Sequence, residues 1–124
     1  MIPETVKKAW SRREGPVILA TVNGDGVPNI IYVTCVSIYG DDRLVVADNY
    51  FDKTRQNIKS GSKGAALFMT DDKKAYQLKG SLEYHEAGPV FEDMKTWNPP
   101  THPGHGATAL VVSEVFSGAE HITS

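Results

Sequence analysis

The sequence predicts a small, mainly β protein, a six-stranded antiparallel barrel with short helices. Residues 75–86 (AYQLKGSLEYHE) alternate between apolar and polar side chains, as a half-exposed strand does. The Asn-Gly and Asp-Gly dipeptides of residues 23–26 favour a tight hairpin between two β-branched runs. The predicted strands lack the regular strand–helix alternation of a parallel sheet. An antiparallel barrel is therefore expected.

The N-terminal elements are predicted from local signals. A helix is expected to begin at Pro3, to include Arg13 and to end at Gly15-Pro16, because proline suits the first helical turn and the Gly-Pro pair breaks the helix. Three strands should follow, over residues 17–22, 29–38 and 43–48. The first two should pair across the 23–26 turn.

The C-terminal part of the chain is expected to contain two helices and three strands. A short helix is expected with Asp52 as its N-cap and Gly61 at its end. A helix over residues 88–97 should be stopped by Pro99-Pro100. Its apolar side chains fall on one side at helical spacing and are read as core: Val90, Phe91, Met94 and Trp97. The strands are expected over residues 65–69, 75–86 and 107–116.

Composition excludes several classes of protein. At 124 residues the chain suits one domain spanning residues 1–124. With 13 Lys and Arg against 15 Asp and Glu, it lacks the basic surface of a protein whose main work is binding nucleic acid. The single cysteine, Cys35, cannot form an internal disulfide. We find no apolar run of the ~20 residues that a membrane helix needs and expect a cytoplasmic protein without a membrane partner.

The most informative segment is residues 49–57 (NYFDKTRQN), where a strand ends and a helix begins. It places Lys53 and Arg55 in the first helical turn, where the helix dipole disfavours cations. A bound anion reverses that preference, because it can accept hydrogen bonds from Lys53, the Thr54 hydroxyl and free backbone N–H groups. The alternative is a solvated helix start in which Asp52 already offsets the dipole.

Other candidates have simpler interpretations. The glycines at 24 and 26 fit a hairpin turn better than a phosphate loop. His102 and His105 lack a visible third ligand, so no metal site is assigned. Cys35 fits a small buried residue better than a nucleophile. Because no catalytic motif occurs, no catalytic residue is assigned, and any demanding chemistry must come from a bound cofactor.

Two stretches, VVADNYFDKTRQNI and AYQLKGSLEY, together with the order of the elements, resemble the pyridoxamine 5′-phosphate oxidase-like FMN-binding split barrels. The likeness covers nearly the whole chain and is strongest to the small FMN-binding proteins. It implies a six-stranded split barrel and a homodimer with FMN at the interface. It also implies that Lys53 and Thr54 bind the FMN phosphate, with Asp48 and Asn49 close by. The flavin ring would lie against Tyr32, Val33 and Thr34, to within one residue.

The sequence departs from the pyridoxamine phosphate oxidases proper, because no arginine follows Arg55 where those enzymes carry a basic C-terminal segment. We therefore expect an FMN-binding protein that transfers electrons to or from an unidentified redox partner, or a small flavin-dependent oxidoreductase, and not a true pyridoxamine phosphate oxidase. The alternatives are a non-catalytic module for flavin or another phosphorylated ligand, a reductase that uses the deazaflavin F420, and a barrel that has lost its ligand.

Overall fold

The computed structural model describes residues 1–123 and contains three helices and eight strands. The helices are α1 (Glu4–Trp10), α2 (Lys53–Lys59) and α3 (Pro89–Trp97). None of them is both long and apolar enough to cross a membrane. The strands are β1 (Arg13–Val22), β2 (Pro28–Val33), β3 (Val36–Tyr39), β4 (Arg43–Asp48), β5 (Lys63–Thr70), β6 (Ala75–His85), β7 (Gly106–Ser117) and β8 (Glu120–Ile122).

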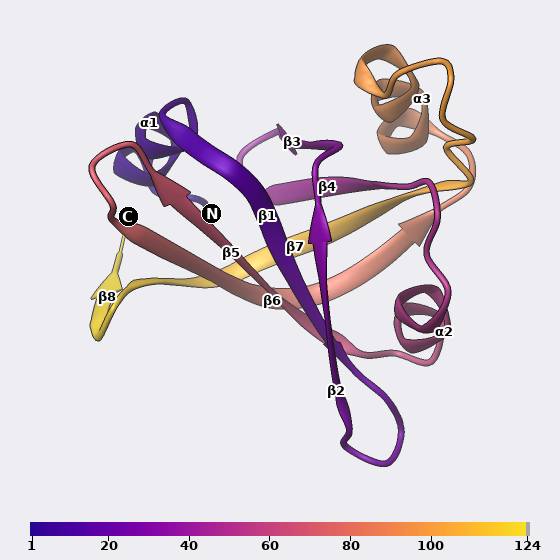
Figure 1. Cartoon of the computed structure of the whole chain (residues 1–124), viewed down its shortest axis with the longest axis horizontal. Coiled ribbons are helices and arrows are strands. Elements are labelled where there is room, and N and C mark those ends of the chain that lie inside the picture. The colour runs from indigo at the N-terminus through magenta and orange to yellow at the C-terminus, as the bar shows by residue number, and fades with distance from the viewer. Residues whose placement is uncertain (124) are drawn as a thin grey trace.

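The strands form one antiparallel sheet in the order β2-β1-β5-β6-β7-β4-β3, and β8 pairs with β7 (Figure 1). The predicted mainly β split-barrel class is confirmed, with eight strands where six were expected. The two end strands, β2 and β3, are joined by only Thr34 and Cys35. This short link forces the sheet to curl until its ends approach, because two residues span less than about 10 Å.

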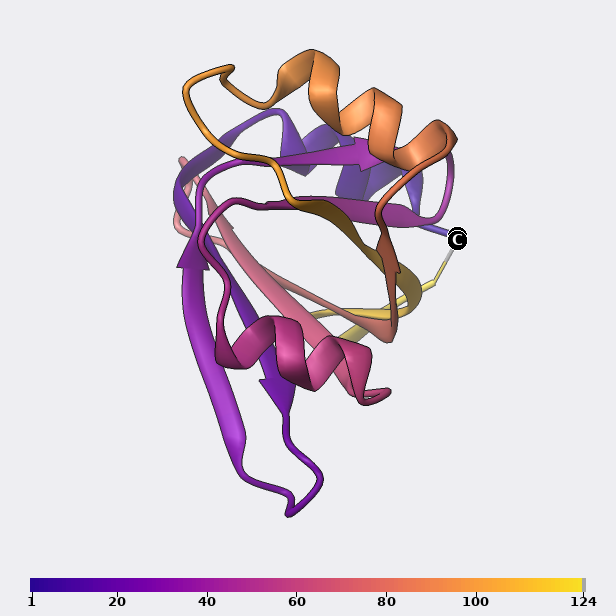
Figure 2. The same cartoon turned by 90° about the vertical axis from the view of Figure 1, so that its right-hand side faces the viewer.

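The predicted strand over residues 29–38 is wrong in one respect, because it breaks at Thr34 and Cys35 into β2 and β3. β2 pairs with β1, whereas β3 pairs with β4 at the opposite end of the strand order. The chain therefore leaves one ladder and joins another, and Figure 2 shows it turning sharply between them. No ladder joins β2 to β3 within residues 1–123, which is what leaves the barrel split.

The N-terminal helix is shorter than predicted. It ends at Trp10, and Arg13 already belongs to β1. Gly15 and Pro16 lie inside this strand, at a shift in the β1–β5 register, where Gly15 has a φ of 73°. A bulge tolerates proline because the extra residue leaves the ladder and needs no N–H donor. The Gly-Pro pair thus marks a bend in the strand and does not end the helix.

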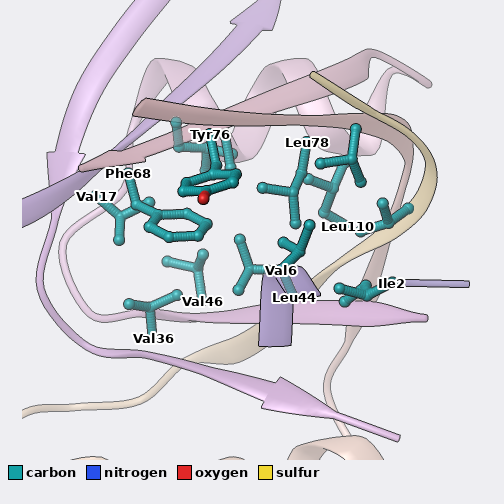
Figure 3. Close-up of a cluster of buried hydrophobic side chains, with 14 of the residues drawn as sticks. Ile2, Val6, Val17, Val36, Leu44, Val46, Phe68, Tyr76, Leu78 and Leu110 are labelled. Carbon is teal, nitrogen blue, oxygen red and sulfur yellow. The ribbon is translucent and has the colours of Figure 1, made fainter. Parts of the chain in front are cut away.

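The main core fills the interior of the barrel (Figure 3). Tyr76 and Leu78 of β6 point inward and are buried, as the alternation of residues 75–86 predicts. The ring of Tyr76 stacks on Phe68 of β5 with centroids 5.2 Å apart. Val6 of α1 is fully buried in the same cluster. The short N-terminal helix therefore packs against the barrel interior.

Helix α3 packs on the outer face of β4 and β7, and Figure 2 shows it lying across one end of the barrel. Val90 and Met94 are buried there against small strand residues, including Ala107 and Ala109. Phe91 and Trp97 are half-buried at the margin of the same cluster. This packing matches the apolar side predicted for residues 88–97.

Candidate functional site

A cavity of about 390 Å³ opens where the barrel is split. Its walls are residues of β2, the β2–β3 link, the end of β4, the loop that leads into α2 and the loop that carries His102. Residues from both sides of the split therefore meet around one space. The lining residues are Asn29, Ile31, Tyr32, Val33, Thr34, Cys35, Ala47, Asn49, Tyr50, Phe51, Asp52, Lys53, Thr54 and His102.

The structure brings most of the predicted site residues together around this cavity. Those that line it are Lys53, Thr54, Asn49, Tyr32, Val33 and Thr34. Asp48 is the exception, because its side chain is fully buried behind the cavity wall. Tyr32 borders the cavity although 74% of it is exposed.

Lys53 and Thr54 are the first two residues of α2 and differ in exposure. Lys53 is exposed, and no carboxylate among residues 1–123 lies within ion-pair distance of it. Thr54 is only 2% exposed. Asp52 occupies the predicted N-cap position but makes no side-chain capping bond, and the helix ends at Lys59, before Gly61. This end of the cavity thus offers an exposed ammonium and a buried hydroxyl.

Arg55 does not join Lys53 at the cavity. Its Nε lies 2.6 Å from Asp48 Oδ2 and its second terminal nitrogen lies 2.9 Å from Oδ1, so the guanidinium contacts both carboxylate oxygens. The Tyr84 hydroxyl also donates to Asp48, at 2.6 Å. The cationic feature predicted for residues 53–55 is therefore reduced to Lys53, since Arg55 is neutralised by a carboxylate from the preceding strand.

The hydrogen bonds around Asp48 control its ionisation. Burial by itself raises the pKa of a carboxyl group, but the hydrogen bonds from Arg55, Tyr84 and the Phe51 N–H outweigh burial and lower the pKa of Asp48 below its usual value. The hydrogen bond to Asp48 in turn raises the pKa of Arg55. Burial, followed by the same carboxylate, raises the pKa of Tyr84 to about 12. The three groups form a charged network that fixes α2 against β4 and β6.

Asn49 anchors a distant loop to the cavity. Its amide exchanges two hydrogen bonds with the amide of Asn98, at 3.0 and 2.9 Å, and its Oδ1 also accepts from the Gly104 N–H at 3.0 Å. This clamp holds the loop that carries His102, whose Nδ1 lies 3.2 Å from the Tyr50 hydroxyl. The role seen for Asn49 is therefore to position the loop wall of the cavity.

Several lining residues were missed by reasoning on the sequence. Tyr50 and Phe51 lie within the segment singled out there, so their place at the site had a local signal. Asn29 was treated only as the start of a strand, and His102 was considered only as a metal ligand and not assigned. Cys35 is half-buried and borders the cavity, where a buried residue was expected. No sequence pattern indicates that these three line one cavity.

Comparison with known proteins identifies the family. The family model described as pyridoxamine 5′-phosphate oxidase matches residues 2–118, which is nearly the whole chain. The chain belongs to the pyridoxamine 5′-phosphate oxidase family. The resemblance noted in the sequence is thereby confirmed. An uncharacterized protein of Methanocaldococcus jannaschii is 27% identical over 106 residues, which cover 82% of this chain and 71% of that protein.

Solved structures of other proteins show the same fold. HupZ of Group A Streptococcus superposes with a TM-score of 0.83 at 22% identity, covering 100% of this chain and 99% of HupZ. An FMN-binding protein from Syntrophomonas wolfei superposes with a TM-score of 0.78 at 23% identity, covering 94% of this chain and 88% of that protein. The fold of the family, with its split barrel, is therefore present in this chain.

Proposed function

We propose that the chain is a single FMN-binding split-barrel domain over residues 1–124 that transfers electrons, as a carrier or as a small flavin-dependent oxidoreductase. The observation that carries the proposal is the cavity at the split, which combines Lys53 and Thr54 at one end with an apolar wall along β2. Its volume of about 390 Å³ falls within the roughly 300–1,000 Å³ of small-molecule sites. Membership of a family with FMN-binding relatives supports the same ligand.

The phosphate of FMN would lie against Lys53 and Thr54. An exposed ammonium and a buried hydroxyl side by side are suited to a phosphate, because hydrogen bonds with an ionised partner are stronger than neutral ones. Asp52 also lines this part of the cavity, and its Oδ1 accepts a weak hydrogen bond from Gln56 at 3.4 Å. The Lys53 ammonium forms no ion pair among residues 1–123 and would be available to an incoming anion.

The ring end of the site would lie along β2. The side chains of Ile31, Val33 and Ala47 form an apolar wall suited to a flat aromatic ring. The backbone edge of β2 that faces away from β1 pairs with no other strand of the described chain, so its N–H and C=O groups are available near Tyr32 and Thr34. Bound FMN would supply the redox chemistry by accepting and donating electrons. The protein would bind and orient it and exclude water, with no residue acting as a covalent catalyst.

A homodimer with FMN at its interface is part of the proposal. The outer face of β2, β1 and β5 carries exposed apolar side chains, with Ile30 at 68%, Tyr32 at 74% and Met69 at 45% exposure. Ile18 of β1 lies opposite both Tyr32 and Leu67, so these side chains form one continuous row across three strands. Contiguous exposed apolar surface is typical of an interaction site. Because Tyr32 also borders the cavity, a second subunit seated on this face would lie beside the bound ligand.

Flavin binding tests the proposal directly. The purified protein, stripped of any bound flavin, would be titrated with FMN and with riboflavin, and binding followed by quenching of flavin fluorescence. We expect micromolar or tighter binding of FMN and weaker binding of riboflavin, which lacks the phosphate. Absence of FMN binding would refute the proposal. Stronger binding of F420 than of FMN would favour the deazaflavin reductase.

A second experiment separates electron transfer from storage. The FMN complex would be photoreduced without oxygen and mixed with an external acceptor such as cytochrome c. An electron-transfer protein should reoxidise rapidly while the flavin stays bound. A storage module should keep its flavin reduced, or lose it before any transfer occurs.

A further inference from the structure

Helix α2 is joined to the β1–β2 hairpin by two crossed hydrogen bonds. Asn29 Nδ2 on β2 donates to Thr54 Oγ1 on the helix at 2.9 Å. Asn57 Nδ2 on the helix donates to Thr21 Oγ1 on β1 at 3.0 Å. Thr21 and Asn29 are cross-strand partners, and Thr54 and Asn57 are three residues apart on one helical face. The four side chains form a polar square. The hairpin contributes one threonine and one asparagine to it, and the helix contributes the other threonine and asparagine.

The two bonds differ in their surroundings. Asn29 and Thr54 line the cavity, whereas Thr21 and Asn57 do not. Thr21, Thr54 and Asn57 are all at least nine-tenths buried. The square thus contains one bond at the proposed phosphate end of the site and a chemically matched bond away from it.

The bond from Asn29 restricts the direction of the Thr54 hydroxyl proton. A hydroxyl has one proton to donate and two lone pairs that accept. The amide nitrogen of Asn29 is only a donor, so the Thr54 proton cannot point toward it. No acceptor for this proton lies within hydrogen-bond distance among residues 1–123. The proton is therefore left to a group in the cavity.

We propose that Asn29 is a positioning residue that fixes the Thr54 hydroxyl as a donor toward the phosphate of the bound flavin. The inference rests on the proposed FMN function and adds to it a residue that acts through Thr54. A hydroxyl whose proton is already directed away from Asn29 loses less rotational freedom when the anion binds. Asn29 therefore contributes to the preference for FMN over riboflavin and little to the binding of the ring.

The test is a double-mutant cycle on the ratio of the dissociation constants for riboflavin and FMN. Thr54→Val removes the donor and should lower the ratio by about tenfold, the effect of losing one hydrogen bond to a charged group. Asn29→Ala should lower it by roughly threefold to tenfold. The double variant should be no worse than Thr54→Val alone, because Asn29 acts only through that hydroxyl. Affinity for riboflavin should stay unchanged in all three.

Asn57→Ala is the matched control. It removes the same kind of bond from the same helix, so it should lower the melting temperature but leave the riboflavin-to-FMN ratio unchanged. If Asn57→Ala lowered the riboflavin-to-FMN ratio as much as Asn29→Ala does, the inference would be overturned. Both bonds would then act only by holding the helix against the β1–β2 hairpin. Additive effects in the cycle would also overturn it, because Asn29 would then contact the ligand independently.

Asn29→Asp provides a second variant of nearly the same shape. Its carboxylate accepts hydrogen bonds only, so it would take the Thr54 proton, and the ratio should fall further than in Asn29→Ala. An unchanged ratio in both Asn29 variants would overturn the inference while leaving FMN binding itself intact. Failure of the unmodified protein to distinguish FMN from riboflavin would overturn the inference alone, whereas failure to bind FMN would overturn the proposed function as well.

Discussion

The Arg55 guanidinium contacts both oxygens of the fully buried Asp48 carboxylate, at 2.6 and 2.9 Å. The two residues connect the third position of α2 to the last position of β4. Tyr84 of β6 donates to the same carboxylate, so three elements meet at one charge. The loop between Asp48 and Lys53 forms one wall of the cavity, and this pair fixes the loop at both ends.

Replacing Asp48 with Asn should destabilise the protein at neutral pH. Arg55 would lose its counter-ion and Tyr84 a strong acceptor. We expect a loss of about 1–3 kcal/mol in the free energy of unfolding, because the Arg55 side chain is 31% exposed and is partly solvated by water. Urea denaturation at pH 7 measures this. Asp25→Asn, in the exposed hairpin turn, is the control and should leave the free energy of unfolding unchanged.

The same variant should change the pH dependence of stability. The pKa of Asp48 is lowered in the folded protein, so its contribution is present above the unfolded pKa of about 3.9 and is lost as the pH falls through the folded value. The difference in free energy of unfolding between wild type and Asp48→Asn should therefore be constant above about pH 5 and shrink below about pH 4. A difference that stays constant down to pH 3 would contradict a lowered pKa at Asp48.

Lys53→Ala should weaken FMN binding by about tenfold and leave riboflavin binding unchanged, because in the proposed complex the ammonium would contact only the phosphate. Raising the salt concentration should reduce the difference between wild type and variant, since Lys53 is exposed and its charge is screened. Lys59→Ala is the control at the other end of α2, outside the cavity lining. Equal losses of FMN affinity in both variants would indicate a general charge effect and refute the assigned role.

Gly80→Ala should destabilise the barrel. A Cβ at position 80 would lie 1.8 Å from the Val111 carbonyl oxygen, at the shift in the β6–β7 register, so the backbone must move. We expect a loss of about 2 kcal/mol or more in the free energy of unfolding. Gly24→Ala, where a Cβ would meet nothing within 4 Å, should have a small effect. Equal effects of the two substitutions on thermal unfolding would contradict close packing at Gly80.

Ile30→Asp should disrupt the proposed homodimer. Ile30 is 68% exposed in the isolated chain, so a charge there should leave folding intact while destabilising an apolar interface. Sedimentation velocity should show a dimer for the wild type and a monomer for the variant, and FMN affinity should fall with dissociation. Thr5→Asp, on the exposed face of α1, should stay dimeric. A wild-type protein that sediments as a monomer would refute the interface.

Much of the fold follows from local sequence signals. The alternation of residues 75–86 reflects which side of β6 is buried, and turn-forming residues 23–26 specify the β1–β2 hairpin. The break at Thr34 and Cys35 has no such signal. The residues around it remain β-branched, and the chain changes ladder there because β3 pairs with β4 and forms the opposite end of the strand order from β2. Likewise, Pro16 predicts the end of a helix from the sequence, whereas in the structure it lies at a bulge in β1.

Lys53 and Thr54 could be proposed as a binding pair from the sequence, because adjacent residues at a predicted helix start are placed by the chain itself. The residues that surround this pair could not be predicted from the sequence. Arg55 turns toward Asp48, Asn29 reaches Thr54 from 25 residues away, and Asn49 anchors the loop of His102 through Asn98, 49 residues away. These contacts exist only once the sheet has curled. Hydrogen bonds between distant residues depend on strand order and register, and closure of the barrel decides which polar groups are already paired and which face the cavity.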